Sequence, residues 1–344
     1  CLDAGLQEEL LTDEVPLPSI KRYPNPSSPQ VDTATIGRVA NLLVEATNPV
    51  VITDFTGRNA QAVGSLIALA ELLALPVIDV GGRFNFPNTH PLDLTGAEGE
   101  LLKKADVILA LDVHNLFKYL TTVERDTRQT DYIVPDNCRI IHFTLQHLAM
   151  KSWSQSYGKL LPIDIPVAAD TALALPVLTT ACHQLLTEKR HAELQERFVN
   201  LKTRHETLRK QWHTVAENAR NKSPIPLPYL AKQVWELIKD EDWAIVNGSL
   251  RGWPRRLWDW DKPYQYIGSP GLGGGLGHSL GAALAHQPKG RLCIDFQPDG
   301  DFLFTPAALW TAAHHHIPLL IIMNNNRSYY NTELHQEVVA NTRG

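Results

Sequence analysis

Two short polar motifs in the C-terminal third of the chain could provide oxygen ligands for a divalent cation. Asp299-Gly300-Asp301 and Asn324-Asn325-Asn326 each follow an apolar run, and Asn325 lies 26 positions after Asp299. A parallel strand–helix–strand unit of that length would place both motifs at one edge of a sheet. Carboxylate, amide and carbonyl oxygens are hard ligands, which suit Mg²⁺ or Ca²⁺ that also binds phosphate oxygens. Asp-Gly and Asn-Asn are each common in turns, but their combination at this separation predicts a cation site.

A glycine-rich segment, residues 271–281, precedes an expected helix in the same region. Glycines at the start of a helix let backbone N–H groups approach a ligand closely, and the helix dipole favours an anion there. The segment is also close to a dinucleotide fingerprint, with Asp295 at the end of the next apolar run as its ribose-binding acid. Tight packing of the helix through small residues is a third interpretation, and the pattern alone does not decide among the three.

The elements that must position these motifs form two α/β units. The apolar runs that we interpret as strands lie at 49–54, 76–80, 106–111, 138–144, 243–247, 291–296 and 319–323. Continuous apolar strands that alternate with helices are typical of parallel sheets buried on both faces. We therefore predict the α/β fold class, with two parallel-sheet domains that carry helices on both faces, the first of them Rossmann-like.

Composition shifts divide the chain into four parts. Residues 1–30 hold five prolines and predict an extended linker, and residues 31–187 form the first domain. Residues 188–223 predict an amphipathic helical connector that packs on the protein body, and residues 224–344 form the second domain. The apolar positions of the connector are Leu194, Phe198, Leu201, Leu208, Trp212, Val215 and Ala219. Because the chain starts with Cys1 and ends without a closing element, we expect a fragment of a longer protein.

The overall charge and the cysteine pattern exclude several classes of partner and site. The 344 residues include 37 acidic and 32 basic side chains, so at a formal charge of -5 we expect no partnership with nucleic acid or membrane. No apolar run approaches the roughly 20 residues that a membrane helix needs. The Trp and Arg residues between 251 and 260 are interpreted as an interface or a pocket rim. Four cysteines without a C-x-x-C pair disfavour zinc or disulfides and predict a cytoplasmic protein.

Several further stretches accompany the two polar motifs. The full set comprises Asp299-Gly300-Asp301-Phe302, Ala308-Leu309-Trp310-Thr311-Ala312-Ala313, Ile317-Pro318 and Met323-Asn324-Asn325. Together they resemble the diphosphate-binding domain of thiamine-diphosphate enzymes, in the group of acetolactate synthase, pyruvate decarboxylase and benzoylformate decarboxylase. Residues 30–187, which include Phe86-Pro87 and His90-Pro91-Leu92, resemble the central domain of that group. The resemblance implies that the second domain is a diphosphate-binding domain that is incomplete at its C-terminal end.

The resemblance implies a set of metal and diphosphate ligands. Asp299, the Asn325 side chain and the backbone carbonyl of Arg327 would bind Mg²⁺, which bridges to the diphosphate of thiamine diphosphate. The N–H groups of Gly300 and Asp301 would hold that diphosphate. Pro298 replaces the first glycine of the family's Gly-Asp-Gly signature, which removes one N–H group and restricts the backbone there.

The resemblance also implies contacts with the rest of the cofactor and with the substrate. Leu272 would be the bulky apolar residue beneath the cofactor that bends it into a V, and the carbonyl of Pro270 would hold its 4′-amino group. Ser249 would add a diphosphate contact. Tyr330 and Asn331 would face the substrate.

The activity implied by the resemblance is that of a thiamine-diphosphate- and Mg²⁺-dependent lyase or transferase that acts on a small-molecule 2-oxo acid. It would be either a decarboxylase or an acetolactate synthase-like carboligase, in a homodimer or homotetramer. The activating glutamate of the family lies in an upstream pyrimidine-binding domain, so no catalytic residue is assigned here, and the fragment alone should be inactive. Asp112-Val113-His114-Asn115 replaces the expected flavin-binding stretch, which makes FAD unlikely. An NAD(P)-dependent oxidoreductase and a non-catalytic relative of the family remain alternatives.

Overall fold

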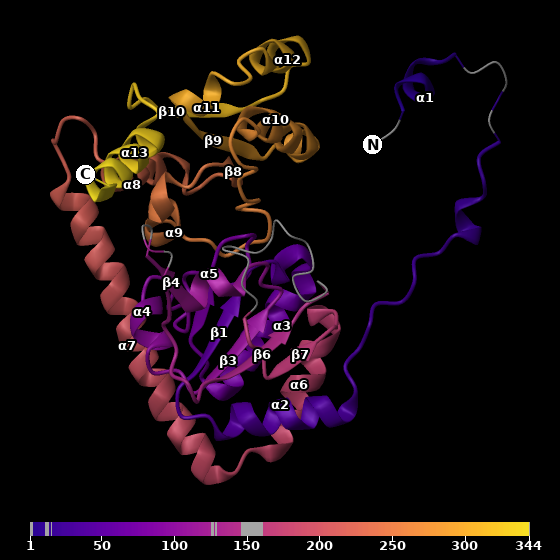
Figure 1. Cartoon of the computed structure of the whole chain (residues 1–344), viewed down its shortest axis with the longest axis vertical. Helices are drawn as coiled ribbons and strands as arrows, with labels where there is room; N and C mark the ends of the chain where they lie inside the picture. Colours follow the sequence, from indigo (N-terminus) through magenta and orange to yellow (C-terminus); the bar gives the residue numbers. More distant parts are fainter. Residues whose placement is uncertain are drawn as a thin grey trace.

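The structure, a computed structural model, describes residues 3–10, 14, 16–124, 127, 129–145 and 161–343. Within these residues two α/β units lie one above the other, and an N-terminal segment extends away from both (Figure 1). This segment contains α1 (Ala4–Glu8) and the 3-10 helix η1 (Ile20–Arg22). Among the described residues, no helix combines the length and the apolar character that crossing a bilayer requires.

The first unit is built on a parallel sheet with the strand order β2-β1-β3-β6-β7. Its strands are β1 (Pro49–Thr53), β2 (Val77–Asp79), β3 (Val107–Leu111), β6 (Arg139–Phe143) and β7 (Ile165–Val167). Every residue of β1, β2 and β3 is buried, because helices cover both faces of the sheet. One face packs on α2 (Thr33–Glu45), α3 (Ala60–Leu73) and α6 (Thr171–Leu185), and the other on α4 (Glu98–Leu102) and α5 (Leu116–Leu120).

The sequence patterns missed two features of this unit. The edge strand β7 has three residues and contains Pro166, which an edge strand tolerates because one side of it makes no ladder hydrogen bonds. The antiparallel hairpin of β4 (Thr121–Val123) and β5 (Thr130–Tyr132) lies in a stretch without a clear pattern. Both features are too short to show a repeating pattern of burial.

A single long helix, α7 (Glu188–Asn218), joins the two units and runs along one side of the first (Figure 1). Its buried residues include Leu194, which packs with α2 and α3, and Ala216, which packs with the second unit. The expected burial of Val215 is wrong, since 47% of its surface is exposed while Ala216 is fully buried. A helix has about 3.6 residues per turn, so a fixed spacing of apolar residues drifts around it. Over the 31 residues of α7 this drift moves the buried face by one position.

The second unit has a parallel sheet with the order β10-β9-β8. Its strands are β8 (Trp243–Asn247), β9 (Leu292–Pro298) and β10 (Leu320–Asn324). Residues of α8 (Leu227–Ile238) and α9 (Trp253–Leu257) pack on one face, and α10 (Gly275–His286) packs on the other. The remaining helices are η2 (Thr56–Arg58) in the first unit and η5 (Leu250–Gly252), η6 (Gln287–Lys289), α11 (Asp299–Phe302), α12 (Ala308–His314) and α13 (Tyr330–Arg343) in the second. The predicted α/β class with helices on both faces of parallel sheets is confirmed.

Helix α9 lies where the two units meet (Figure 1). Arg255 of this helix forms a buried ion cluster with two carboxylates of the first unit. The Arg255 guanidinium lies 3.2 Å from Asp79 at the end of β2 and 3.3 Å from Asp93. Beside it, the Asn88 side chain donates to the Trp258 carbonyl at 2.9 Å and accepts the Trp260 N–H at 2.8 Å. Burial raises the pKa of Asp79, and the charge of Arg255 opposes that rise. Of the Trp and Arg residues interpreted as an interface or a pocket rim, Arg255, Trp258 and Trp260 therefore lie at an interface between the two units.

Candidate functional site

The carboxyl ends of the three parallel strands in the second unit meet at one edge of the sheet. Pro298, the last residue of β9, pairs with Asn324, the last residue of β10. The turns that follow the two strands therefore start side by side. Pro298 has φ -69°, which lies close to the angle that its ring imposes, so it enters α11 without strain.

The side-chain oxygens of Asp299 and Asn325 converge at this edge. The backbone N–H of Arg327 donates to Asp299 Oδ2 and to Asn325 Oδ1, each at 3.0 Å. Because one N–H group contacts both oxygens, they lie around a common point, as the separation of the two motifs predicts. Arg327 has φ +58°, the left-handed conformation that turns the chain back toward the sheet edge.

The donor set at this point fits a hard divalent cation. Asp299 is partly exposed and Asn325 is exposed, so a cation and phosphate oxygens can reach both. Within the described ranges, no three His, Cys, Asp or Glu side chains form a group that could hold a metal. A site with one carboxylate and one amide oxygen suits Mg²⁺, which usually keeps waters and phosphate oxygens as further ligands. The third ligand, the carbonyl of Arg327, stays a prediction.

A buried polar network that the sequence analysis missed lies beside this point. Asn247 donates to Asp295 Oδ1 at 2.9 Å and to Gln297 Oε1 at 3.0 Å, and it accepts the Ser269 hydroxyl at 2.8 Å. Gln297 in turn donates to Asp301 Oδ2 at 2.8 Å. Asp295 is fully buried, and this burial raises its pKa while the Asn247 hydrogen bond opposes the rise. Polar residues inside otherwise apolar strands were the signal available in the sequence.

The same network reaches the glycine-rich segment. The Gly273 N–H donates to Asp301 Oδ1 at 2.5 Å, just before α10 begins at Gly275. The anion near the start of this helix is thus a carboxylate of the chain itself. Asp295, which a dinucleotide would need for its ribose, is buried and hydrogen-bonded to Asn247. This geometry disfavours the dinucleotide interpretation.

Gly275 lets α10 approach the network closely, and its replacement by Ala is expected to destabilise the protein. An added Cβ would lie 2.5 Å from Asp301 Oδ2 and 2.7 Å from Asn247 Nδ2, so buried hydrogen-bonded groups must move. We expect a loss of about 1–3 kcal/mol in the free energy of unfolding, measured in urea. Gly277→Ala is the matched control, because its added Cβ would have no heavy atom within 4 Å apart from the neighbouring backbone of its own helix. Equal effects of the two variants would contradict the close approach.

The five residues expected to contact the rest of the cofactor or the substrate lie around this edge. Ser249 follows β8 and is exposed, Pro270 is half-buried, and Leu272 is 77% exposed. Tyr330 and Asn331 are exposed at the start of α13. Their roles stay predictions.

Tyr329 is a further residue that the sequence analysis did not select. Its hydroxyl donates to the Gly300 carbonyl at 3.3 Å, and its ring lies 2.8 Å from the position of a Cβ on Gly300. It therefore covers the turn that carries Asp299. Spacing alone could not show which of Tyr329 and Tyr330 faces this turn.

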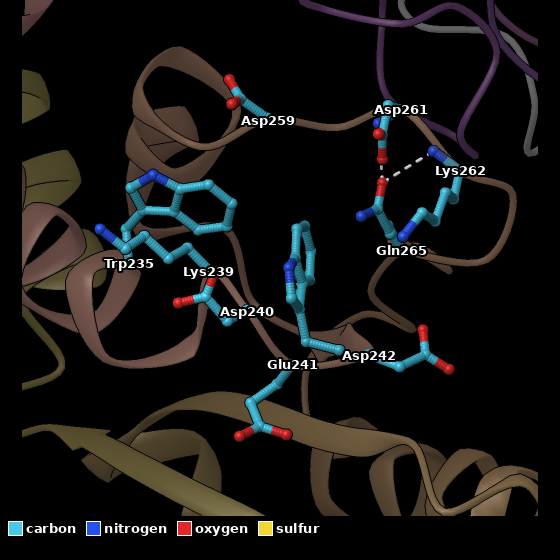
Figure 2. A pocket seen from close by; sticks show the side chains of 10 residues that line it. Trp235, Lys239, Asp240, Glu241, Asp242, Asp259, Asp261, Lys262 and Gln265 are labelled. Atoms are coloured by element: carbon cyan, nitrogen blue, oxygen red, sulfur yellow. Dashed lines mark hydrogen bonds between the residues drawn. The ribbon is translucent and has the colours of Figure 1, made fainter.

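A separate hollow of about 330 Å³ lies at the opposite, amino end of β8 (Figure 2). Trp235, Trp243 and several acidic side chains line it. The carboxylates of Asp240, Glu241 and Asp242 point in different directions rather than toward one centre. Asp242 is also paired with Arg291 at 3.0 Å. The length of the strand separates this hollow from the candidate site.

Comparison with known protein families identifies both units. The model of the thiamine pyrophosphate enzyme central domain matches residues 36–178, and that of the C-terminal TPP binding domain matches residues 247–343. The chain belongs to the thiamine pyrophosphate enzymes. The matched TPP binding domain contains the glycine-rich segment and both polar motifs.

Individual relatives agree with this membership of the thiamine pyrophosphate enzymes. A probable acetolactate synthase large subunit of Methanocaldococcus jannaschii is 25% identical over 319 residues, which cover 85% of this chain and 49% of the relative. The acetolactate synthase of Mycobacterium leprae is 23% identical, with 86% and 45% covered. The chain spans about half the length of the curated relatives that it matches.

A solved structure shows the same fold. The thiamine diphosphate-dependent 4-hydroxybenzoylformate decarboxylase of Rhodococcus jostii RHA1 aligns with a TM-score of 0.61 at 21% identity. The alignment covers 90% of this chain and 54% of the decarboxylase. The α/β arrangement predicted from the sequence therefore matches that of an experimentally solved thiamine diphosphate-dependent enzyme.

Proposed function

We propose that this chain is part of a Mg²⁺-dependent thiamine pyrophosphate enzyme that cleaves or forms a C–C bond of a 2-oxo acid. The observation that carries the proposal is the convergence of Asp299 Oδ2 and Asn325 Oδ1 within the matched TPP binding domain. These two oxygens, with the carbonyl of Arg327, would hold Mg²⁺. The N–H groups of Gly300 and Asp301, in the first turn of α11, would donate to the diphosphate.

The chemistry and the binding roles divide between the cofactor and the chain. When bound, thiamine diphosphate supplies an electron sink for the carbanion that C–C cleavage produces. The chain anchors the charged end of the cofactor and positions the strand-end loops around it. Ser249, Pro270 and Leu272 would bind the cofactor, and Tyr330 and Asn331 would face the substrate.

The strand ends of the central domain support the expectation that FAD is not used. At the end of β3, Asp112 accepts the Thr171 hydroxyl at 2.6 Å and lies 3.6 Å from Arg58. At the end of β1, Asp54 lies 3.6 Å from His114. Both carboxylates at this edge already have partners within the chain, and a carboxylate offers no hydrogen-bond donor to the phosphates of a flavin nucleotide.

The domain limits and the assembly are part of the same proposal. We place a linker at 1–30, the central domain at 31–187, the helical connector at 188–223 and the TPP-binding domain at 224–344. We infer a cytoplasmic homodimer or homotetramer, in which an upstream domain supplies the activating glutamate.

The full-length protein tests this function directly. Incubated with thiamine diphosphate, Mg²⁺ and a panel of 2-oxo acids that starts with pyruvate, it is expected to release CO₂. Chromatography of the products would then distinguish a decarboxylase, which yields an aldehyde, from a carboligase, which yields a 2-hydroxy-2-alkyl-3-oxo acid. Chelation of Mg²⁺ should abolish turnover. Retention of NAD(P) without thiamine diphosphate, or cofactor retention without turnover of any 2-oxo acid, would contradict the proposal.

A further inference from the structure

The Asp301 side chain joins two loops that both belong to the candidate site. One carboxylate oxygen accepts the Gly273 N–H at 2.5 Å, and the other accepts the Gln297 side chain at 2.8 Å. We propose that Asp301 is a positioning residue whose carboxylate holds the glycine-rich segment against the Asp299 turn. Its expected effect on cofactor binding rests on the proposed function, whereas its effect on the segment does not.

The glycine-rich segment needs such a contact because glycine has unusual conformational freedom. Gly271 and Gly273 have φ +44° and +80°, so the segment adopts left-handed conformations just before α10. No side chain of these glycines can restrict the backbone, and ordering them costs more entropy than ordering other residues. A carboxylate that accepts the Gly273 N–H supplies a charge-assisted hydrogen bond, and the dipole of the 12-residue helix α10 favours a negative group there.

The Asp301 carboxylate is itself held in place by buried hydrogen-bonded side chains of β9 and β8. Gln297 is fully buried and Asn247 is 3% exposed, and their hydrogen bonds continue from Asp301 to Asp295 at the middle of β9. Gly275 packs so closely on Asp301 Oδ2 that a Cβ there would lie 2.5 Å from it. The side chain is therefore directed toward α10, and its role differs from the diphosphate contact that we propose for the backbone N–H of the same residue.

Because the side chain and the Asp299 turn have different roles, loss of the side chain should affect the binding of thiamine diphosphate and of inorganic pyrophosphate differently. The side chain of Asp301 would act on the glycine-rich segment, which holds the thiamine end of the cofactor in the proposed function. The Asp299 turn would bind the diphosphate end. Loss of the Asp301 carboxylate should therefore weaken the binding of thiamine diphosphate while it leaves the binding of inorganic pyrophosphate with Mg²⁺ unchanged.

The experiment compares Asp301→Ala and Asp301→Asn with the wild type in the full-length protein. Hydrogen exchange of the amides at 271–275, measured without any ligand, should speed up roughly 10- to 100-fold in Asp301→Ala, because a hydrogen bond to a charged acceptor is lost. Asp301→Asn keeps one acceptor oxygen for Gly273, so it should exchange at an intermediate rate. Calorimetry should show at least about 10-fold weaker thiamine diphosphate binding for Asp301→Ala, with pyrophosphate binding within about 2-fold of wild type.

Three results would overturn the proposal. Unchanged exchange at 271–275 in both variants would show that the carboxylate does not hold the segment. An equal loss of pyrophosphate and thiamine diphosphate affinity would make Asp301 a ligand of the diphosphate end. A gain in pyrophosphate affinity would make its carboxylate a competitor of phosphate. If the wild type binds no thiamine diphosphate, the proposed function fails, and the ligand-free exchange rates still decide the role of Asp301.

Discussion

Replacing Asp299 with Ala in the full-length protein is expected to weaken Mg²⁺-dependent binding of thiamine diphosphate by at least about 100-fold. The carboxylate oxygen of Asp299 converges with Asn325 Oδ1, so loss of Asp299 removes the charged ligand of the proposed site. Outer-shell partners of metal ligands already contribute about 10- to 100-fold to affinity, and a direct ligand should contribute no less. Calorimetric titration of Mg²⁺ in the presence of the cofactor measures the effect.

Two further variants distinguish the loss of a metal ligand from a disruption of the turn that carries Asp299. Asp299→Asn keeps an oxygen that can accept the Arg327 N–H but loses the negative charge, so it should fold normally and still bind Mg²⁺ poorly. Asp240→Ala removes the same charge from an exposed position near the other end of β8. This variant should bind Mg²⁺ and thiamine diphosphate as tightly as the wild type does. Wild-type affinity for Mg²⁺ in both Asp299 variants would show that Asp299 is not a ligand of the metal.

Replacing Arg255 with Met is expected to lower the free energy of unfolding by about 3–5 kcal/mol. The Arg255 guanidinium is the cation that faces both Asp79, whose side chain is fully buried, and Asp93. Without it, two buried carboxylates at the junction of the two units would keep their desolvation cost and lose their attraction. Denaturant unfolding, monitored by tryptophan fluorescence, is suitable because Trp258 and Trp260 lie next to this cluster.

The control for Arg255 is an exposed ion pair of the same type. Arg139 lies 2.7 Å from Asp164, with 62% and 31% of the two side chains exposed, so Arg139→Met should cost only about 0–1 kcal/mol. A similarly small cost for Arg255→Met would show that the cluster does not stabilise the contact between the units.

The pH dependence gives a second signature of the same cluster. Burial raises the pKa of Asp79, and Arg255 opposes this rise. Removing Arg255 should raise the pKa further in the folded state. A carboxyl group with a raised folded-state pKa binds a proton more readily when folded than when unfolded, so acidification below that pKa favours the folded state. The loss in free energy of unfolding caused by Arg255→Met should therefore become smaller as the pH falls from 7 toward 4.

The sequence by itself determined the fold class and the edge of the sheet where the site lies. Continuous apolar runs such as 106–111 and 243–247 identify strands that are buried on both faces, because polar residues there could not be solvated. Parallel strands end at one edge, so the motifs after β9 and β10 had to meet. The convergence of Asp299 and Asn325 was predictable for this reason. The resemblance to thiamine-diphosphate enzymes came instead from the residue types of the motifs themselves.

The tertiary structure decided which side chains act together across long separations. The contacts between Gly273 and Asp301, between Asn247 and Gln297, and between Arg255 and Asp93 join residues that are 28, 50 and 162 positions apart. A local pattern reports whether a residue is helical, extended or buried, but it holds no information on which distant group satisfies a buried polar atom. That choice depends on how the loops and helices pack. At the N-terminal end of α10, where the sequence suggested a bound phosphate, the packing places the carboxylate of Asp301.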